Sequence, residues 1–129
     1  MRNKFQEWFR QADYDMDTAD AMFASGRYFY AVFMCHLSLE KALKGLIAKR
    51  LDELPPKTHN LLYLLNMLAL QPPSALERFI ARLNTASVAT RYPDDLAKMQ
   101  AAYTENVTKE LIMKSKEVLE WAKTQLQQQ

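Results

Sequence analysis

Polar residues whose types and spacing suit chemistry occur in three short stretches of this 129-residue chain. His36, Glu40 and Lys44 recur at every fourth residue, so on a helix they line up along one edge. Glu40 precedes Lys44 in the favoured orientation for a helical ion pair. The second stretch is segment 57–59 (KTH), and the third is segment 91–94 (RYPD). These residue types could bind a phosphate or serve as acids and bases.

A phosphate or a nucleotide is the ligand that the two later stretches suit best. His59 lies at the start of an expected third helix, where free N–H groups and the helix dipole favour an anion. Arg91 follows the expected end of the fourth helix, and Tyr92 could stack on a base. Composition and spacing alone favour a structural alternative. In that alternative His59 lies over the edge of the bundle, and Arg91 forms a salt bridge with Asp94 that fixes the turn.

Metal binding and cysteine catalysis both lack a complete set of residues. His36 and His59 are the two histidines of the chain, and Cys35 is its one cysteine. Adjacent helical residues point a quarter turn or more apart, so Cys35 and His36 cannot chelate one ion together. Cys35 falls on an apolar helix face, which indicates an inert core residue. We therefore expect no metal site and no cofactor.

Hydrophobic residues recur every three or four positions in five segments, which predicts five α-helices. The expected helices cover residues 4–24, 28–50, 58 to about 70, 74 to just before 92, and about 104 to about 126. The second helix is apolar over more than half of its circumference, so it should lie at the centre. Short connectors between five helices predict an all-α fold, an antiparallel up-and-down bundle in a single domain spanning 1–129.

Cap and turn residues set the expected boundaries of these helices. Gly26 suits a left-handed helix end, and Pro93 pushes Tyr92 out of the helical region. Thr58 is expected to cap the third helix, and segment 74–77 (SALE) fits a capping box that opens the fourth. A solvated face is expected for the acidic residues of the first helix, which are Asp13, Asp15, Asp17 and Asp20.

Composition excludes several classes of protein. The chain has 17 basic and 15 acidic residues, and a net charge of +2 is too balanced to indicate nucleic-acid binding by charge alone. Its 2 glycines make a Walker loop or a dinucleotide-binding fingerprint improbable. No apolar run is long enough for a membrane span, and the N-terminal segment resembles neither a signal nor a transit peptide. We expect a cytoplasmic protein that does not bind membranes.

Several pieces of the sequence resemble one family, in the same order along the chain. Segment 39–46 (LEKALKGL) looks like the Glu-Lys-x-x-Lys signature of HEPN domains. Segment 57–61 (KTHNL) resembles the start of their third helix, and segment 91–94 (RYPD) resembles their Arg-aromatic-Pro turn. Segments 8–12 (WFRQA) and 28–31 (YFYA) complete a resemblance that spans nearly the whole chain.

The resemblance implies a small helical bundle that commonly dimerises. Many HEPN domains pair with a minimal nucleotidyltransferase encoded beside them, as a toxin–antitoxin module, and the family name reflects proposed nucleotide binding. The active members are described as metal-independent ribonucleases, whose motif places a histidine a few residues after an arginine, where two subunits meet. The positions where that histidine belongs after Arg91 are Leu96, Ala97 and Lys98, so the ribonuclease motif is incomplete in this chain.

The favoured hypothesis is a dimeric HEPN binding module that engages a nucleotide, an RNA or a nucleotidyltransferase partner without cutting RNA. Arg91 and Lys44 would contact phosphate, and Tyr92 would stack on a base. Glu40 would orient Lys44 or Arg91. The full set of expected ligand-binding residues is Arg91, Tyr92, Lys44, Glu40, His59 and Asp94.

The alternative hypothesis is an enzyme. In it, the chain is a metal-independent ribonuclease toxin with a non-standard catalytic site built from Arg91 and His59. A histidine suits this chemistry because it can take up and release a proton near neutral pH. The alternative requires the fold to bring His59 beside Arg91.

Overall fold

The computed structural model describes residues 4–128 and folds them into six α-helices with no strand among them. In chain order the helices are α1 (Phe5–Ala24), α2 (Tyr28–Arg50), α3 (Leu61–Leu68), α4 (Ser74–Arg91), α5 (Leu96–Ala102) and α6 (Glu105–Gln125). The predicted all-α fold is confirmed. The periodicity analysis missed α5, because a helix of 7 residues is too short to show a clear apolar stripe.

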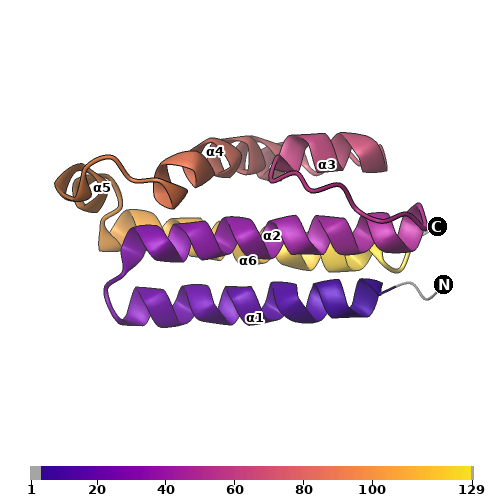
Figure 1. Cartoon of the computed structure of the whole chain (residues 1–129), viewed down its shortest axis with the longest axis horizontal. Coiled ribbons are helices and arrows are strands. Elements are labelled where there is room, and N and C mark those ends of the chain that lie inside the picture. Colours follow the sequence, from indigo (N-terminus) through magenta and orange to yellow (C-terminus); the bar gives the residue numbers. More distant parts are fainter. Residues whose placement is uncertain (1–3, 129) are drawn as a thin grey trace.

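Helix α2 is the centre of the bundle and packs against each of the other five helices. In Figure 1, α1 and α6 run alongside α2, while α3 and α4 form a second layer over it and α5 lies beyond the end of α4. The long helices α1, α2, α4 and α6 alternate in direction along the chain, which is the predicted antiparallel up-and-down arrangement.

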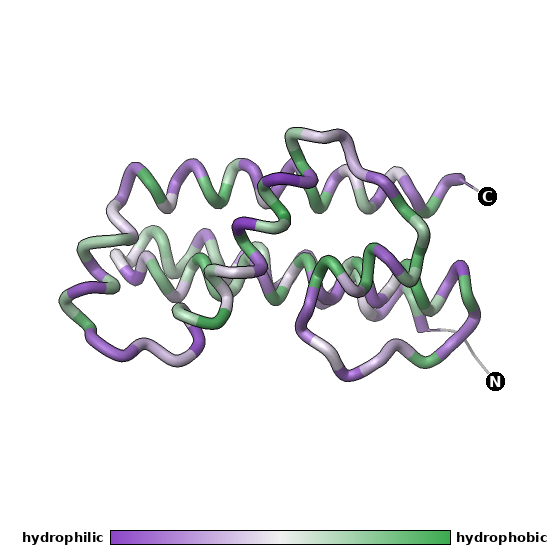
Figure 2. The backbone as a smooth tube through the Cα atoms, turned by 90° about the horizontal axis from the view of Figure 1, so that it is seen from above, coloured by the Kyte–Doolittle hydropathy of each residue, from purple (hydrophilic) through white to green (hydrophobic). Residues whose placement is uncertain are grey.

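The central position of α2 follows from its sequence. Hydrophobic and hydrophilic residues alternate within each helix in Figure 2, but α2 buries side chains around most of its circumference. Burial of the apolar ones is the main force that holds the other helices on it. Helix α2 also buries polar side chains, and these are His36, Ser38, Glu40 and Lys44. A buried polar group needs a hydrogen-bond partner, so these residues constrain whatever packs over them.

Most of the predicted boundaries are confirmed. Gly26 follows α1 with a φ of 77°, the left-handed conformation that glycine tolerates. Helix α4 ends at Arg91, and Tyr92, which precedes Pro93, leaves the helical region with a φ of −129° and a ψ of 70°. The hydroxyl of Thr104 accepts a hydrogen bond from the Val107 N–H and so caps α6.

The predicted start of the third helix was wrong. Helix α3 begins at Leu61, and its cap is Asn60, whose side-chain oxygen accepts from the N–H groups of Leu62 and Tyr63. Asparagine is as good a helix cap as threonine, and here it stands closer to the apolar stripe. The Thr58 hydroxyl instead accepts from the Asn60 N–H at 3.1 Å.

The predicted capping box of the fourth helix does not form. Ser74 is already helical, and Pro73 occupies the cap position without a side-chain hydrogen bond. The carboxylate of Glu77 accepts from the side-chain amide of Gln71, at 3.1 and 3.2 Å, rather than from the backbone. A proline directly before the first turn presets the backbone angle there, so the helix starts without the box.

One of the acidic residues expected on a solvated face is buried. Asp15 is 5% exposed, and its Oδ2 lies 2.9 Å from Nζ of Lys41 on α2. Asp13, Asp17 and Asp20 are exposed, as predicted. The Asp15–Lys41 ion pair thus links the two helices inside their interface.

No helix within residues 4–128 combines the length and the apolar character that crossing a membrane requires.

Helices α1 and α2 are in close contact at Gly45. A Cβ placed on Gly45 would lie 2.7 Å from Cε2 and 2.8 Å from Cδ2 of Phe9, and 3.1 Å from Cβ of Trp8. Phe9 is a buried core residue, so its ring has little room to move. The absence of a side chain at position 45 therefore lets the aromatic pair of α1 sit directly against the backbone of α2.

The Gly45→Ala substitution should destabilise the protein. Overpacking costs about 1–3 kcal/mol, and the better helix propensity of alanine returns only about 1 kcal/mol of that. Thermal or chemical unfolding monitored by circular dichroism measures the difference. The double variant Phe9→Leu/Gly45→Ala should lose less stability than the sum of the two single variants, because the smaller side chain makes room. Additive losses would contradict the close contact.

Candidate functional site

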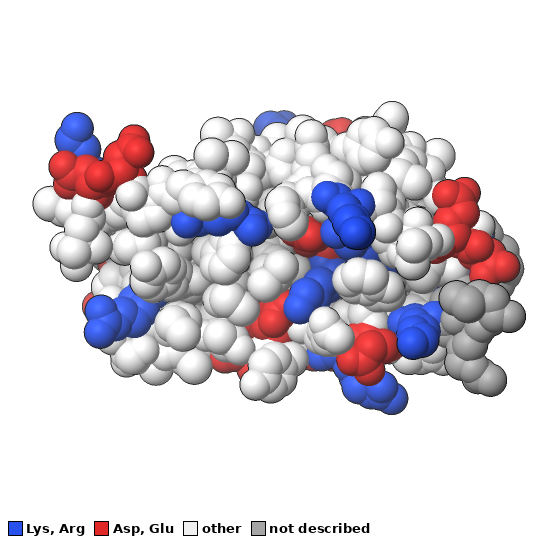
Figure 3. All heavy atoms as spheres, viewed as in Figure 1, with Lys and Arg blue, Asp and Glu red and all other residues white. Residues whose placement is uncertain are grey.

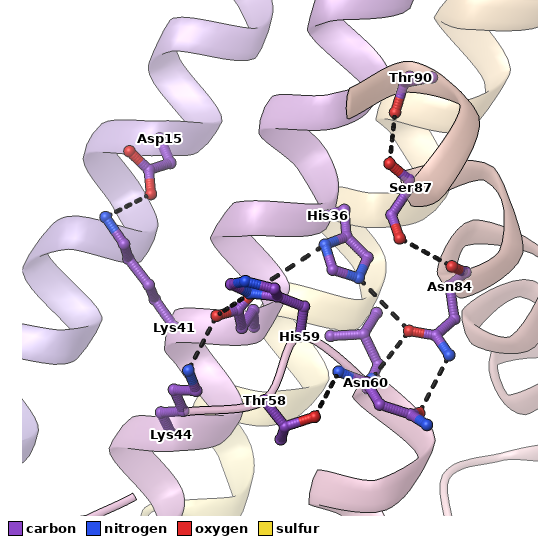
Figure 4. Close-up of polar contacts among 12 residues, drawn as sticks. Asp15, His36, Lys41, Lys44, Thr58, His59, Asn60, Asn84, Ser87 and Thr90 are labelled. Carbon is purple, nitrogen blue, oxygen red and sulfur yellow. Dashed lines mark hydrogen bonds and ion pairs between the residues drawn. The ribbon is translucent and has the colours of Figure 1, made fainter. Parts of the chain in front are cut away.

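The carboxylate of Glu40 on α2 is the centre of a polar cluster. Figure 4 shows the side chains of Lys44, His59 and His36, which belong to this cluster, close together. Glu40 is only 4% exposed. Its Oε2 accepts a hydrogen bond from Nζ of Lys44 at 2.9 Å. Nδ1 of His59 lies 2.9 Å from Oε1 and 3.1 Å from Oε2. The predicted ion pair with Lys44 is confirmed, and the fold adds His59, which arrives from the connector between α2 and α3.

Lys44 balances the charge of Glu40 inside the protein. It is 6% exposed, and its Nζ lies 6.0 Å from the centroid of the Trp8 ring. A buried carboxylate is very costly without a matching charge and hydrogen bonds, and Lys44 supplies both. Because its ammonium lies between Glu40 and the Trp8 ring, Lys44 neutralises the charge of Glu40 and is largely shielded from solvent.

The amide of Asn84 ties three helices together beside this cluster. Its Oδ1 accepts from the Leu61 N–H at 2.8 Å, and Nε2 of His36 lies 3.4 Å from the same oxygen. Its Nδ2 donates to Oδ1 of Asn60 at 3.0 Å. Asn84 is on α4, His36 is on α2, and Asn60 and Leu61 begin α3. The Asn84 amide therefore fixes the start of α3, next to His59, over the polar face of α2.

His36 is a buried imidazole in a defined state. The oxygen of Asn84 faces His36 because the Asn84 nitrogen is occupied by Asn60, so Nε2 of His36 carries the hydrogen. Burial lowers the pKa of His36, which keeps the ring neutral. Its Nδ1 has no hydrogen-bond partner and lies 4.0 Å from Oε1 of Glu40. The hydrogen bond with Asn84 and the charge of Glu40 act in the opposite direction and raise this pKa, while the positive charge of Arg91 lowers it.

Arg91 is the last residue of α4, and its guanidinium lies over the ring of Phe33 on α2, with Cζ 4.7 Å from the ring centroid. A cation at the C-terminus of a helix is favoured by the dipole, and stacking on an aromatic ring suits the flat guanidinium. Its Nη2 is buried and makes no hydrogen bond. The side chain is thus held in place while one of its donor groups lacks an acceptor.

Tyr92 and Asp94 lie away from these contacts. Tyr92 is 73% exposed, and Asp94 is exposed as well. The salt bridge between Arg91 and Asp94 that the structural alternative expected is not among the ion pairs of residues 4–128, because Arg91 turns toward Phe33 instead. The turn after α4 therefore leaves an aromatic ring and a carboxylate in solvent.

The site has two parts along one face of α2. Arg91 lies over Phe33, and His59 is bonded to Glu40. Positions 33 and 40 are about 10 Å apart along the axis, at about 1.5 Å of rise per residue. Arg91 and His59 therefore contact α2 about two turns apart on the same face, and the buried His36 lies between the two contact positions along the helix.

Basic residues do not extend the site into a charged patch. Lys57, Arg78 and Arg82 are exposed and take part in none of the contacts described above. On the face shown in Figure 3, blue and red side chains are interspersed. Within residues 4–128, no three side chains of His, Cys, Asp or Glu are grouped so that they could hold a metal ion.

Cys35 is fully buried on α2, as predicted. Burial raises the pKa of its thiol to about 12. The thiolate is the reactive form of cysteine, so this residue is not a nucleophile in the folded protein.

The sequence alone did not identify the residues that hold the side chains of the site in position. Asn60 could have been identified as a helix cap, since asparagine is strongly preferred there. Asn84 and Phe33 gave no comparable signal, because a single amide or ring inside a helix is ordinary until a neighbouring helix is placed against it. His36 was noticed for its spacing, but its complete burial depends on the same packing.

Comparisons with known proteins point to one family. The profile of the HEPN domain matches residues 5–125. A crystal structure of ST0689, described as an archaeal HEPN homologue, is similar with 27% identity and a TM-score of 0.77, covering 97% of this chain and 98% of its own. A crystal structure of TT1696 from Thermus thermophilus is similar with 25% identity and a TM-score of 0.79, covering 95% and 98%. No curated protein matches the chain.

The neutral, buried state of His36 should make stability depend on pH. As pH falls through about 6.5, the unfolded chain takes up a proton at this position that the folded protein resists, so the free energy of unfolding should fall by about 1–2 kcal/mol between pH 7 and 5. Urea unfolding at several pH values measures this slope. The variant His36→Gln, which can still donate to Asn84, should show a shallower slope. Equal slopes would contradict the assignment.

Proposed function

Because the chain belongs to the HEPN domain family, we propose that it is a binding module whose Arg91 holds a phosphate of a nucleotide or of RNA. The observation that carries this proposal is the state of Arg91: its guanidinium is fixed on Phe33 at the end of α4, and the side chain is only partly buried. Arginine recognises phosphate through paired N–H donors, and a guanidinium that is already oriented loses little freedom when it does so. A phosphate oxygen would bond to the part of the guanidinium that stays accessible, since Nη2 itself is buried.

The neighbouring residues support this role to different degrees. Tyr92 directly follows Arg91 and is exposed, so it is placed to stack on a base. Lys44 and Glu40 satisfy each other in the interior, and we assign them to holding His59 in place rather than to contacting phosphate. Asp94 is exposed beside Tyr92, and a carboxylate there would repel a second phosphate and so limit how the ligand lies.

We further propose that the protein acts as a homodimer, and that its partner is a minimal nucleotidyltransferase in a cytoplasmic module of the toxin–antitoxin type. Family resemblance supports the partner. The dimer is supported by exposed apolar side chains close to Arg91 in sequence, namely Val88 at 66% and Leu96 at 62% exposure. Exposed apolar groups gathered in one region commonly mark an interface.

A ribonuclease is the second candidate, and one contact favours it. His59 is bonded to the buried Glu40 through Nδ1, which is how a carboxylate orients a histidine that acts as a base. The spacing along α2 argues against it within a single subunit. A scissile phosphate needs both groups within about 3 Å of the reacting atoms, and Arg91 and His59 lie over positions about 10 Å apart.

The substitution Arg91→Ala should weaken binding of single-stranded RNA and of nucleotides about 10- to 100-fold, the usual effect of losing a hydrogen bond to a charged group. Fluorescence anisotropy with a labelled oligonucleotide measures the change. Arg78→Ala is the matched control, since it removes an exposed arginine from the same helix, and it should have little effect. Equal effects of the two variants would show that Arg91 contributes only its charge.

The same samples distinguish the second candidate. RNA recovered intact after incubation with excess chelator supports a binding module. Cleavage that disappears in a His59→Ala variant would instead identify the protein as a ribonuclease and overturn the proposal.

A further inference from the structure

A cavity opens at the end of the bundle where α1 turns into α2 and where α5 lies (Figure 1). Its volume is about 380 Å³, and its lining comes from the first turn of α2, from α5 and from the connector that follows α5. Sites for small molecules commonly have volumes of roughly 300–1,000 Å³. Glu40, His59 and Arg91 do not line this cavity, so it is separate from the site described above.

One face of α5 covers the cavity and is only partly packed on the core. Leu96, Gln100 and Tyr103 all line the cavity, and their spacing of four and three residues puts them on one side of the helix. Leu96 remains 62% exposed, and Met99 is the one residue of α5 that is buried. A helix of 7 residues has little stability of its own and depends on burial of its apolar side. A ligand in the cavity would supply the burial that α5 lacks.

Aromatic side chains form much of the cavity wall. Tyr28, Phe29, Tyr30 and Tyr103 all line it. Neighbouring rings hold two of them in place: the centroids of Tyr28 and Phe23 are 5.4 Å apart, and those of Tyr30 and Phe29 are 4.5 Å apart. Aromatic rings pack favourably on other rings at such distances, in offset or edge-to-face arrangements. A wall of this kind favours a ligand with a flat ring.

The charge of the lining is positive. Among residues 4–128, Arg27 is the one charged residue that lines the cavity, and it takes part in none of the ion pairs of this part of the chain. A guanidinium pairs with a carboxylate through two parallel hydrogen bonds, and one cation matches one such group. We infer that the cavity binds a small aromatic carboxylate, whose ring packs against Tyr28, Tyr30 and Tyr103 and whose carboxylate pairs with Arg27. Binding there does not depend on the role proposed for Arg91.

Indole-3-acetate is a suitable probe, because it combines a flat ring with one carboxylate. Titrated into the full-length ¹⁵N-labelled protein, it should shift the NMR signals of residues 26–30 and 96–104 in a saturable way. Indole-3-acetamide keeps the ring without the charge and should bind about tenfold more weakly, the usual effect of losing a hydrogen bond between charged groups. Cyclohexylacetate keeps the charge without the aromatic ring and should bind about two- to tenfold more weakly. Hydrogen exchange of the α5 amides should slow when indole-3-acetate is bound.

The substitution Arg27→Gln should weaken binding of indole-3-acetate about tenfold and leave that of indole-3-acetamide unchanged, since only the first compound offers a carboxylate. Arg27 is exposed, so the variant should fold normally. Arg78→Gln is the matched control, because it removes another exposed arginine that lies outside the cavity, and it should change neither affinity.

Several results would overturn the inference. One is the absence of saturable shifts at the cavity residues with millimolar indole-3-acetate. Equal binding of the three compounds, or equal effects of the two variants, would remove the assigned chemistry. Shifts confined to Arg91 and Tyr92 would place the carboxylate in the proposed phosphate site instead. If the signals of the cavity residues change when the protein alone is diluted, a second copy of the chain covers the cavity and the ligand assignment fails.

Discussion

The buried carboxylate of Glu40 places a strict requirement on the structure around it. A carboxylate at 4% exposure in the central helix must find donors that match its charge and occupy both of its oxygens. Lys44 meets part of this requirement from within α2, and His59 meets the rest from outside it. The connector after α2 must therefore return over its own helix. The polar site forms where His59, in this connector, contacts the two carboxylate oxygens of Glu40.

The elements were predictable because they depend on local sequence. The spacing of apolar residues identifies a helix without knowledge of its neighbours, and the broad apolar arc of α2 already indicated its central position. The Glu40–Lys44 pair was predictable for the same reason, since both residues lie on one turn-spaced row. Gly26 and the Pro93 turn followed from backbone sterics, which also require no tertiary information.

The site was only partly predictable, because its decisive contacts join residues far apart in sequence. Spacing marked Glu40, His59 and Arg91 as candidates, but nothing local indicates that His59 reaches Glu40 or that Arg91 stacks on Phe33. Asn84 is the clearest case. In the sequence it is an ordinary polar residue of α4, and its hydrogen-bond partners are on α2 and α3. The burial of Asp15 was missed for the same reason, because Lys41 lies on another helix.

Helix α4 carries both Asn84, which holds the His59 end of the site, and Arg91 at the other end. Seven residues are close to two full turns, so the two side chains emerge on the same side of one rigid rod. Binding of a ligand that spans both ends would require little further ordering of the protein's side chains, because packing and hydrogen bonds already restrict them in the folded state. For this site, most of the conformational entropy lost on binding would be that of the ligand.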